Sequence, residues 1–483
     1  MIGTLAFRHL LVKKARSLFL LLGFSLGVGV MIVLLSVGEA MLEQSRDVSL
    51  VGGGELTALP QGIDVEAMRT GGLGGMFFTI ERARFLTRQA LGGERHRDLI
   101  RSVAPGIEGK LIYLCPASGE CRPTAVRAGG EIPSRAAALG AGLDLLVGRW
   151  VDSPADSAYV APTSQQLYDD LDRFHLPRAP DSTWGEWHYF NFVTGPDEWW
   201  YITFLIGGEV SSTGGGRWGG RMLVTHRRPD GRHDRYTADV PPEGVTFDTT
   251  RADLAIGRSW VRQRDGEYRL HVAASGRRGR AQLDLTVRPK PNRYFPPVEL
   301  RQDDFLSGYV VPALAATASG RACAAGRCTE IRETPAYHDH NWGVWRDVTW
   351  EWGAAQGERV SLLYGGVYGP RDVGSSPFFL TLVDSLGVRR VLRFGRIDYR
   401  GSRGADGLPG ARAPERFTLE AVWEADTVRL SVAVEHALAS EVSASTHRRT
   451  FLQMRGRFQL EGRVLADSLN DSGQGFFETY LPR

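Results

Sequence analysis

The sequence predicts a mainly β protein in which two tandem β-barrels follow one transmembrane helix and a small α/β domain. An uncharged segment near the start of the chain predicts the helix. After about residue 183, short runs of alternating apolar and polar residues are separated by turn residues, as in antiparallel strands. The chain also contains 58 glycines and 12 tryptophans, and turn-rich chains with many aromatic residues are typically β proteins.

Composition bounds the number of domains and the class of partner. A chain of 483 residues is long enough for about two to four domains, each with its own core. The 42% apolar and 23% charged residues are ordinary for a folded protein. The net charge is only +3, so the sequence indicates no nucleic-acid partner.

The predicted membrane helix covers residues 17–38, after a basic N-terminus at 1–16. Ser17–Val37 holds 21 residues without a charge, about the length that a helix needs to cross a bilayer. Lysine and arginine precede this segment and acidic residues follow it, so the positive-inside rule places the N-terminus in the cytoplasm. We expect a single-pass protein of the inner membrane with the bulk of the chain extracytoplasmic, in the periplasm.

A cleaved signal peptide is the alternative to a retained anchor. The segment Gly38-Glu39-Ala40 offers small residues at cleavage positions. The apolar run is longer than that of a usual signal peptide, however, which favours the anchor.

The beginning of the chain resembles a transporter subunit. The segments KKARSLFLLLGFSLGVGVMIVLLSVGEAMLEQ (13–44) and ELTALPQGIDVEAM (55–68) are similar to the opening of FtsX-like, MacB-type ABC-transporter permeases. Such permeases return to the membrane several times, whereas this chain has no second apolar run of that length. We therefore expect an anchor with a permease-like α/β domain at 39–162, which could partner a true permease and its ATPase. Apolar residues at helical spacing predict a surface helix of that domain at 79–91.

The four cysteines form two local pairs. Cys115 and Cys121 flank one short loop, and Cys323 and Cys328 flank another. Even, local pairs after an export segment predict two loop-closing disulfides. A zinc site with four thiolates is the alternative, but neither pair has the short C-x2-C spacing that is common in such sites.

The β region begins after a polar, proline-containing segment at 163–182, which we interpret as a linker. We divide the region into a first barrel at 183–315 and a second barrel at 316–483, because this length exceeds one small barrel and suits two. Residues 221–240 predict a hairpin that turns at Pro229-Asp230-Gly231.

A short repeat opens the β region. EWHYFNF (186–192) recurs as EWWYITF (198–204), which predicts two strands of a hairpin. Alternation puts Trp187, Trp199 and Tyr201 on one face and Trp200 on the other. We expect these aromatic residues to bind ligand on a cavity-lining face; the alternative is that they fill a barrel core.

The segment YHDHNWG (337–343) carries the densest set of reactive side chains. In a strand, Tyr337, Asp339 and Asn341 point one way, and His338, His340 and Trp342 point the other way. The order DEWWYITF, YHDHNWG and GQGFFETY resembles the hydroxyneurosporene synthase (CrtC, carotenoid 1,2-hydratase) and AttH family over about residues 180–483. The resemblance implies two tandem lipocalin-like β-barrels and cofactor-free hydration of an isolated double bond in an acyclic carotenoid.

Hydration of such a bond requires an acid that can protonate carbon. Burial in an apolar environment keeps a carboxylic acid protonated by raising its pKa. Asp339 is the candidate acid, in the role that the resemblance gives to the Asp of Tyr-x-Asp, with Tyr337 beside it. Aromatic faces, including Trp342, would stabilise the cation, and His338 or Asn341 would guide the water.

Other interpretations of the motif remain open. Asp339, Asn341 and Gly343 could organise a buried turn. His338 and His340 could bind a metal with His188 as a third ligand. A Ser-His-Asp hydrolase is disfavoured because no G-x-S-x-G elbow occurs.

One departure from the hydratases bears on the reaction. They use a His and a Trp shortly before Tyr-x-Asp, whereas SGYVVP (307–312) offers only Tyr309.

Two functions of different class follow from the sequence. The first is a membrane-anchored hydratase-like hydro-lyase, or an isomerase, acting on an apolar isoprenoid or lipid without a cofactor or a metal. The second is a non-enzymatic lipid carrier that works with an ABC-transporter permease.

The topology prediction is tested by protease access. With residues 17–38 as the only membrane helix, residues 39–483 should be digested by protease added outside the inner membrane. A C-terminus that resists digestion until the membrane is permeabilised would contradict this topology.

Overall fold

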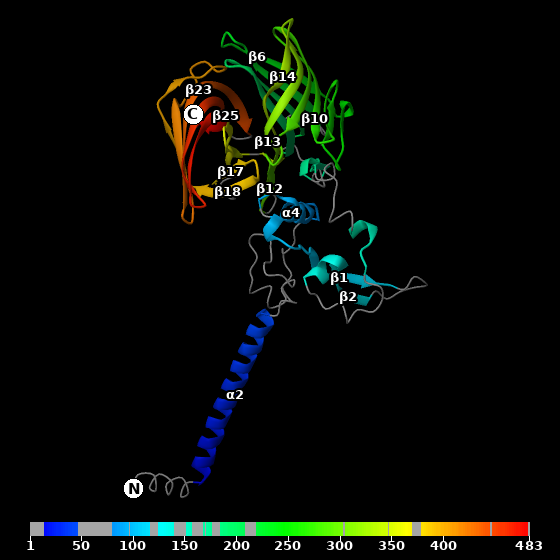
Figure 1. Cartoon of the computed structure of the whole chain (residues 1–483), viewed down its shortest axis with the longest axis vertical. Helices are drawn as coiled ribbons and strands as arrows, with labels where there is room; N and C mark the ends of the chain where they lie inside the picture. Colours follow the sequence, from blue (N-terminus) through cyan, green and yellow to red (C-terminus); the bar gives the residue numbers. More distant parts are fainter. Residues whose placement is uncertain are drawn as a thin grey trace. The chain divides into compact units, whose positions relative to one another are not determined.

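A computed structural model of the chain describes residues 14–46, 80–95, 97–115, 124–139, 151–156, 168–169, 171–175, 184–207, 219–302, 305–345, 347–369, 378–444 and 447–481. The chain divides into two compact units. The first contains 1–83 and 100–160, and the second contains 84–99 and 161–483. Figure 1 labels the elements along the chain.

The described residues of the first unit include the segment predicted as an anchor. The described elements of this unit are α2 (Lys14–Arg46), the antiparallel pair β1 (Gly106–Leu114) and β2 (Thr124–Glu131), and α5 (Pro133–Ala138). Helix α2 includes all of 17–38. In the part of the chain that is described, no helix meets the length and apolarity criteria for a membrane span. The single-pass topology stays a prediction.

Helix α4 (Ile80–Gly92) forms where helical spacing predicted a helix. From Arg84 onward it belongs to the unit of the barrels, together with the 3-10 turn Arg97–Leu99. Two long-range contacts show this: Arg95 pairs with Asp384, and Gln89 is hydrogen bonded to Tyr294. The expectation that this helix covers the permease-like domain is therefore corrected.

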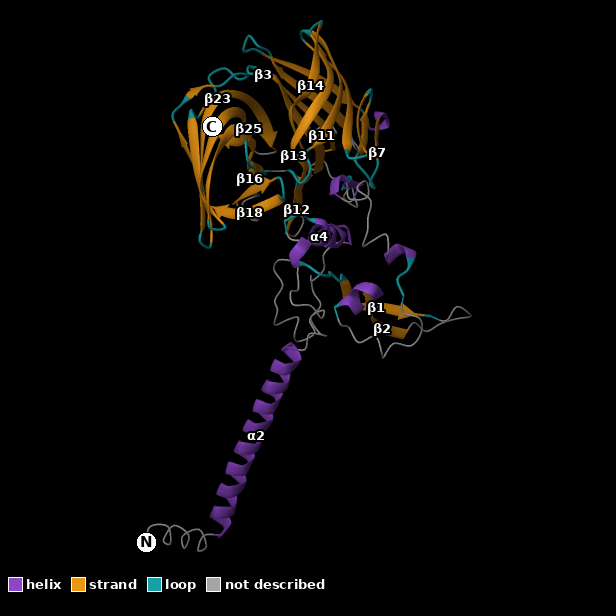
Figure 2. Ribbon diagram, in the orientation of Figure 1, coloured by secondary structure: helices purple, strands orange, loops and turns teal. Residues whose placement is uncertain are grey.

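The first barrel closes with eight antiparallel strands (Figure 2). In order around the barrel they are β11 (Gly279–Pro289), β13 (Phe305–Ala324), β14 (Arg327–Val344), β3 (Trp184–Gly195), β4 (Glu198–Gly207), β5 (Gly220–Arg227), β6 (His233–Val240) and β10 (Glu267–Gly276). Strands β7 (Val245–Phe247), β8 (Asp253–Ile256) and β9 (Ser259–Arg264) extend from β10, and β12 (Phe295–Gln302) pairs with β13.

The second barrel also closes with eight antiparallel strands. They are β18 (Gly387–Phe394), β17 (Phe378–Asp384), β16 (Ser361–Tyr368), β15 (Thr349–Gly357), β25 (Asp467–Leu481), β24 (His447–Val464), β23 (Asp426–Ala444) and β22 (Arg416–Trp423), with β19 (Ile397–Arg400) paired to β22. Two tandem barrels confirm the predicted fold class. The boundary that we placed at 315/316 falls inside β13, however. Because β13 and β14 complete the first barrel, the boundary lies between Val344 and Thr349.

Both predicted hairpins form. β3 pairs with β4 across Gly195 and Glu198, so the two halves of the repeat are neighbouring strands. β5 and β6 turn where Pro229-Asp230-Gly231 predicted, and Gly231 has φ +83, a conformation that glycine adopts without strain.

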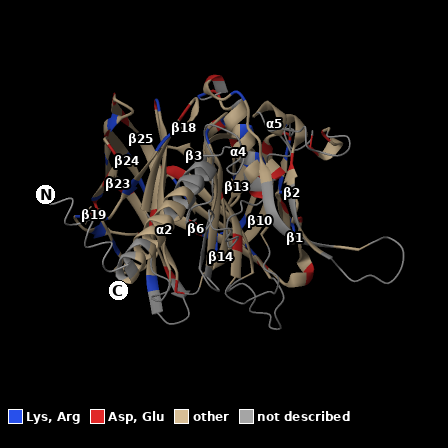
Figure 3. Cartoon of the chain, turned by 90° about the horizontal axis from the view of Figure 1, so that it is seen from below, with Lys and Arg blue, Asp and Glu red and all other residues tan. Residues whose placement is uncertain are grey.

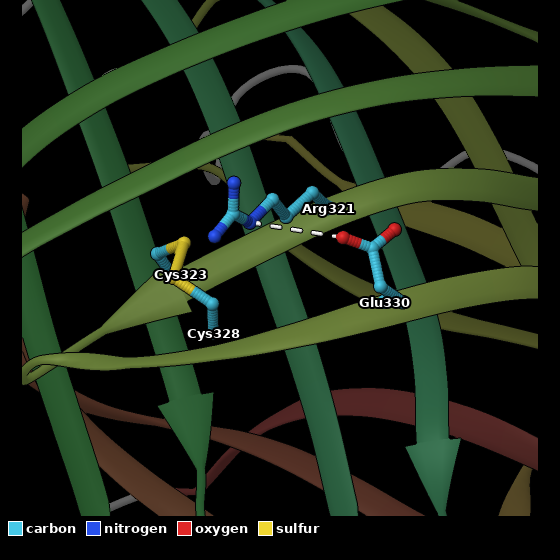
Figure 4. Close-up of a disulfide and its surroundings, with 4 residues drawn as sticks. All are labelled: Arg321, Cys323, Cys328 and Glu330. Atoms are coloured by element: carbon cyan, nitrogen blue, oxygen red, sulfur yellow. Dashed lines mark ion pairs between the residues drawn. A yellow bond between two sulfur atoms is a disulfide. The ribbon is translucent and has the colours of Figure 1, made fainter.

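A disulfide closes the turn between β13 and β14. Cys323 and Cys328 are bonded, next to the ion pair of Arg321 with Glu330 (Figure 4). Cys115 is also disulfide-bonded, but its predicted partner Cys121 lies outside the described residues.

Charges of both signs are interspersed along the strands that Figure 3 shows. This distribution agrees with the net charge of +3.

A separate apolar cluster joins the barrels. Each barrel interior has its own core, and a third buried cluster contains residues of both barrels: Tyr189, Trp199, Tyr201, Phe295, Tyr309, Val311, Leu314 and Tyr337 from the first, and Trp352, Ala354, Leu363, Val383 and Phe476 from the second. Polar contacts add to it, since Arg227 bonds to His436, and His233 pairs with Asp406. The outward face of β3, β4 and β14 is therefore buried between the barrels.

Gly308 tests how tightly β14 packs. Gly308 lies on β13, where it pairs with Trp342 of β14. A Cβ atom at Gly308 would lie 2.2 Å from the indole of Trp342. Gly308→Ala should lower the free energy of unfolding by about 1–3 kcal/mol, because the ring must move. The measurement is urea unfolding, with Gly395→Ala as the control, since a Cβ at Gly395 would have no neighbouring atom within 4 Å. Equal stability of the two variants would contradict this packing.

Candidate functional site

The motif on β14 separates two sets of side chains. Tyr337 belongs to the cluster between the barrels, whereas His338 stacks on Phe190 in the first barrel's core, with ring centroids 4.0 Å apart. This alternation is the two-residue period of a strand. Gly343 ends the motif with φ +146, and a Cβ there would lie 2.3 Å from the Leu306 carbonyl oxygen, so only glycine fits.

Asp339 is a buried acid between the barrels. Its exposed fraction is 3%, and Asn341 Nδ2 donates a hydrogen bond of 2.6 Å to its Oδ1 atom. Burial raises the pKa of Asp339 well above its ordinary value, and the nearby Glu478 raises it further, while hydrogen bonds with Tyr337 and Asn341 lower it. Burial therefore favours the protonated, neutral form of this carboxyl.

Glu478 is a second buried carboxyl, contributed by β25 of the other barrel. Trp350 Nε1 donates to its Oε2 atom at 3.0 Å, and Gln453 Nε2 donates to its Oε1 atom at 3.1 Å. Burial raises the pKa of Glu478, and these two hydrogen bonds oppose the rise. The sequence analysis did not identify Glu478 as a site residue, although Glu478 lies in the closing GQGFFETY segment that supported the family resemblance.

Aromatic rings pack around Tyr337, which is hydrogen bonded to Asp339. Trp352 Nε1 donates a hydrogen bond of 3.1 Å to the hydroxyl of Tyr337. The ring of Phe476 lies 4.6 Å from Tyr337 and 5.8 Å from Tyr189, between ring centroids. Trp352 and Phe476 come from the second barrel, so the site requires both barrels.

The predicted ligand-binding aromatic residues divide between three places. Tyr201 and Trp199 lie in the cluster between the barrels, and Trp187, half-buried beside Trp345, packs against that same cluster. Trp200 belongs to the first barrel's core, where it stacks on a histidine, and Trp342 packs in a small cluster elsewhere on β14.

Trp199 makes cation–π contacts with two arginines. The guanidinium carbons of Arg227 and Arg455 lie 4.5 Å and 5.2 Å from its ring centroid. Its indole therefore holds two arginines at the junction through cation–π contacts, and Tyr201 and Trp187 remain as the predicted aromatic residues on the face of Asp339.

His338 does not lie beside Asp339. Its Nδ1 atom bonds to the Tyr189 carbonyl oxygen at 3.0 Å, and its Nε2 atom faces Asp172 at 3.2 Å. The expectation that His338 guides water at Asp339 is corrected, because alternation along β14 turns its ring into the first barrel. Asn341 lies on the same face as Asp339 and is hydrogen bonded to it, so its role in guiding water stays a prediction.

The side chains of β14 that point into the first barrel contact acidic residues that the sequence analysis did not identify. Asp172 comes from the segment interpreted as a linker, and it is fully buried inside the first barrel. Glu186 from β3 is also fully buried. The ring of His340 lies between them: burial lowers its pKa, but the hydrogen bonds to Asp172 and Glu186 outweigh burial and raise the pKa to about 9. The described residues 171–175 of the predicted linker thus contribute to the barrel interior, which the polar composition of that segment did not indicate.

Comparisons with known proteins give only distant likenesses. No protein-family model and no curated protein matches the chain. The chain is similar to the solved structure of AttH from Nitrosomonas europaea, at 16% identity over 64% of this chain and 97% of that one, with a TM-score of 0.43. It is similar to kievitone hydratase from Nectria haematococca, at 13% identity over 62% and 90%, with a TM-score of 0.42. It is also similar to CghA with Sch210972, at 11% identity over 66% and 97%, with a TM-score of 0.44.

The raised pKa of Asp339 predicts a pH dependence of stability. Because the folded state holds this proton more tightly than the unfolded chain does, the stabilisation is fully present below about pH 4 and is lost as the pH rises through the folded-state pKa. Relative to Asp339→Asn, the wild type should lose up to about 1.4 kcal/mol of unfolding free energy per pH unit over that window. Urea unfolding between about pH 5 and pH 8 measures this.

The control for this prediction is Asp398→Asn, at a carboxyl whose side chain is 43% exposed. Its unfolding free energy should follow that of the wild type across the same range. If the curves of the wild type and Asp339→Asn also stay parallel, Asp339 does not hold its proton in the folded state.

Proposed function

We propose that the two-barrel unit binds an apolar isoprenoid or lipid between its barrels and adds water to, or isomerises, a carbon–carbon double bond of that ligand. The observation that carries this proposal is Asp339, a buried acid with a raised pKa among aromatic rings and opposite a second carboxyl. The resemblance of the YHDHNWG segment to CrtC-type hydratases supports it. The activity requires no cofactor in this proposal.

The first step is proton transfer to carbon. The protonated Asp339 carboxyl gives its proton to the less substituted carbon of the double bond, and the π electrons form the new C–H bond. A tertiary cation and the Asp339 carboxylate result. The carboxylate and the rings of Tyr337, Tyr189 and Phe476 stabilise the cation electrostatically.

The second step decides between hydration and isomerisation. In hydration, the oxygen of a water molecule bonds to the cation, and a proton from that water passes to the Asp339 carboxylate. In isomerisation, the cation instead loses a proton from the adjacent carbon to the same carboxylate. Asn341 fixes the orientation of Asp339 through its 2.6 Å hydrogen bond. Both outcomes return the site to its starting protonation state.

A carrier is the second candidate function. The N-terminal segment, similar to a permease opening, favours it, because a transport system needs an acceptor for its lipid. Helix α2 presents exposed apolar side chains, including Phe19 at 77% and Val30 at 52% exposure. We propose that this helix anchors the chain in the inner membrane with the barrels outside, where they would meet a permease and its ATPase.

The enzymatic proposal is tested on the full chain with acyclic polyenes as substrates. Asp339→Asn keeps the shape of the side chain and removes the transferable proton, so turnover should fall at least about a hundredfold while ligand affinity changes little. Asp398→Asn is the control and should keep wild-type turnover. Product analysis by mass spectrometry, with ligand binding measured in parallel, gives both quantities.

The carrier function predicts a different result from the same experiment. The wild-type chain would then co-purify with a lipid and convert none of the polyenes, and aromatic truncations rather than Asp339→Asn would weaken binding. Full turnover by Asp339→Asn would contradict the proposed role of the acid.

A further inference from the structure

A second cluster of polar side chains lies inside the first barrel, on the face of β14 opposite Asp339. It contains Asp172 from the segment before β3, His188 from β3 and His338 from β14, and each side chain is 0% exposed. Phe174 and Phe190 pack against these rings. The proposed hydration chemistry uses none of these residues.

The atoms of this cluster are close enough to share one ion. Asp172, His188 and His338 each offer one ligand atom, and these atoms lie within 4.8 Å of one another. In a tetrahedral zinc site with bonds of about 2.1 Å, two ligand atoms lie about 3.4 Å apart. Side-chain rotation that brings the more distant atoms closer by about 1.4 Å or less would therefore complete the set.

The hydrogen bonding of His338 selects the nitrogen that would bind metal. Nδ1 lies 3.0 Å from the Tyr189 carbonyl oxygen, which can only accept a hydrogen bond, so Nδ1 carries hydrogen. In the neutral ring, Nε2 therefore presents its lone pair to Asp172 Oδ2 at 3.2 Å. A cation between these two acceptors turns that contact into an attraction, and a backbone bond at the other nitrogen is the usual support for a histidine ligand.

His188 provides the independent observation. Among the described residues, neither of its ring nitrogens has a hydrogen-bond partner, although the side chain is fully buried. Buried polar groups without partners are rare in folded proteins and call for an unseen ion or water. A proton on His338 would satisfy that ring and Asp172, but it would leave His188 unpaired.

Neighbouring groups hold the carboxylate in place. Tyr268 donates a hydrogen bond of 2.6 Å to Asp172 Oδ2. His340 faces Asp172 at 2.7 Å with one nitrogen and Glu186 at 2.9 Å with the other, so both nitrogens donate and neither is free to bind metal. These contacts orient Asp172 as supporting residues orient the ligands of metal sites.

We propose that Asp172, His188 and His338 bind one divalent transition-metal ion, such as zinc, inside the first barrel. Two imidazoles and one carboxylate are a donor set that zinc and ferrous iron both use. The ion would tie the segment around Asp172 to β3 and β14. This site is separate from the proposed catalytic acid, and the expectation of a metal-free protein changes accordingly.

The first measurement is metal content of the full, untagged chain purified from cells grown with added zinc. Elemental analysis for all first-row transition metals should find about one ion per wild-type chain. His188→Gln should retain less than about a tenth of that content, because a ligand is lost. His226→Gln is the matched control and should keep the ion, since His226 is another buried histidine of this barrel that bonds to Glu198 instead.

The second measurement needs only the wild type and covers the case in which His188→Gln does not fold. Chelator-treated chain should gain about 5 °C or more in melting temperature when zinc is added. X-ray absorption of the zinc-loaded chain should show nitrogen and oxygen ligands at about 2.0–2.1 Å.

Several outcomes would overturn the site. They are a wild type with neither bound metal nor a zinc-dependent melting shift, equal metal content in the two glutamine variants, and sulfur ligands in the absorption spectrum. Loss of polyene turnover in Asp339→Asn with the metal retained would leave both proposals standing, whereas unchanged turnover would remove only the catalytic one.

Discussion

The alternation of side chains along β14 is the constraint on which the site depends. A strand directs successive residues to opposite faces, and both faces of β14 are covered, one by the first barrel's interior and one by the second barrel. The outward face carries Asp339, and the inward face carries His338. A one-residue slip of register would exchange these two sets, so the ladders of β14 with β3 and β13 fix the chemistry on each face.

Burial gives the two faces their different electrostatic character. Between the barrels, Asp339 and Glu478 approach each other among aromatic rings, and their removal from solvent favours the neutral forms. Inside the first barrel, burial would raise the pKa of Asp172, but its interactions with the surrounding histidines outweigh burial and hold that pKa well below the ordinary value. The face of β14 between the barrels therefore carries an acid whose neutral form is favoured, and the inward face lies against the charged carboxylate of Asp172, which comes from another segment.

On each face of the β14 motif, a residue that is remote in sequence completes the group of polar side chains. Glu478 lies at the end of the chain and Asp172 lies before the first barrel strand, yet both lie beside the β14 motif. The closing of β25 onto β15 places Glu478 at the junction of the barrels. The segment around Asp172 packs into the first barrel, because Phe174 is part of the core of that barrel.

The sequence by itself determined the two barrels, the two hairpins and the alternation within YHDHNWG, because these features follow from local periodicity and turn residues. It did not determine the barrel boundary, since β13 and β14 look like any other strands until their partners are known. It also did not reveal Glu478 or Asp172 as site residues, or which face of the motif turns into the interior of the first barrel. Only the tertiary structure decided these points, because burial and partnership depend on long-range packing that no local pattern encodes.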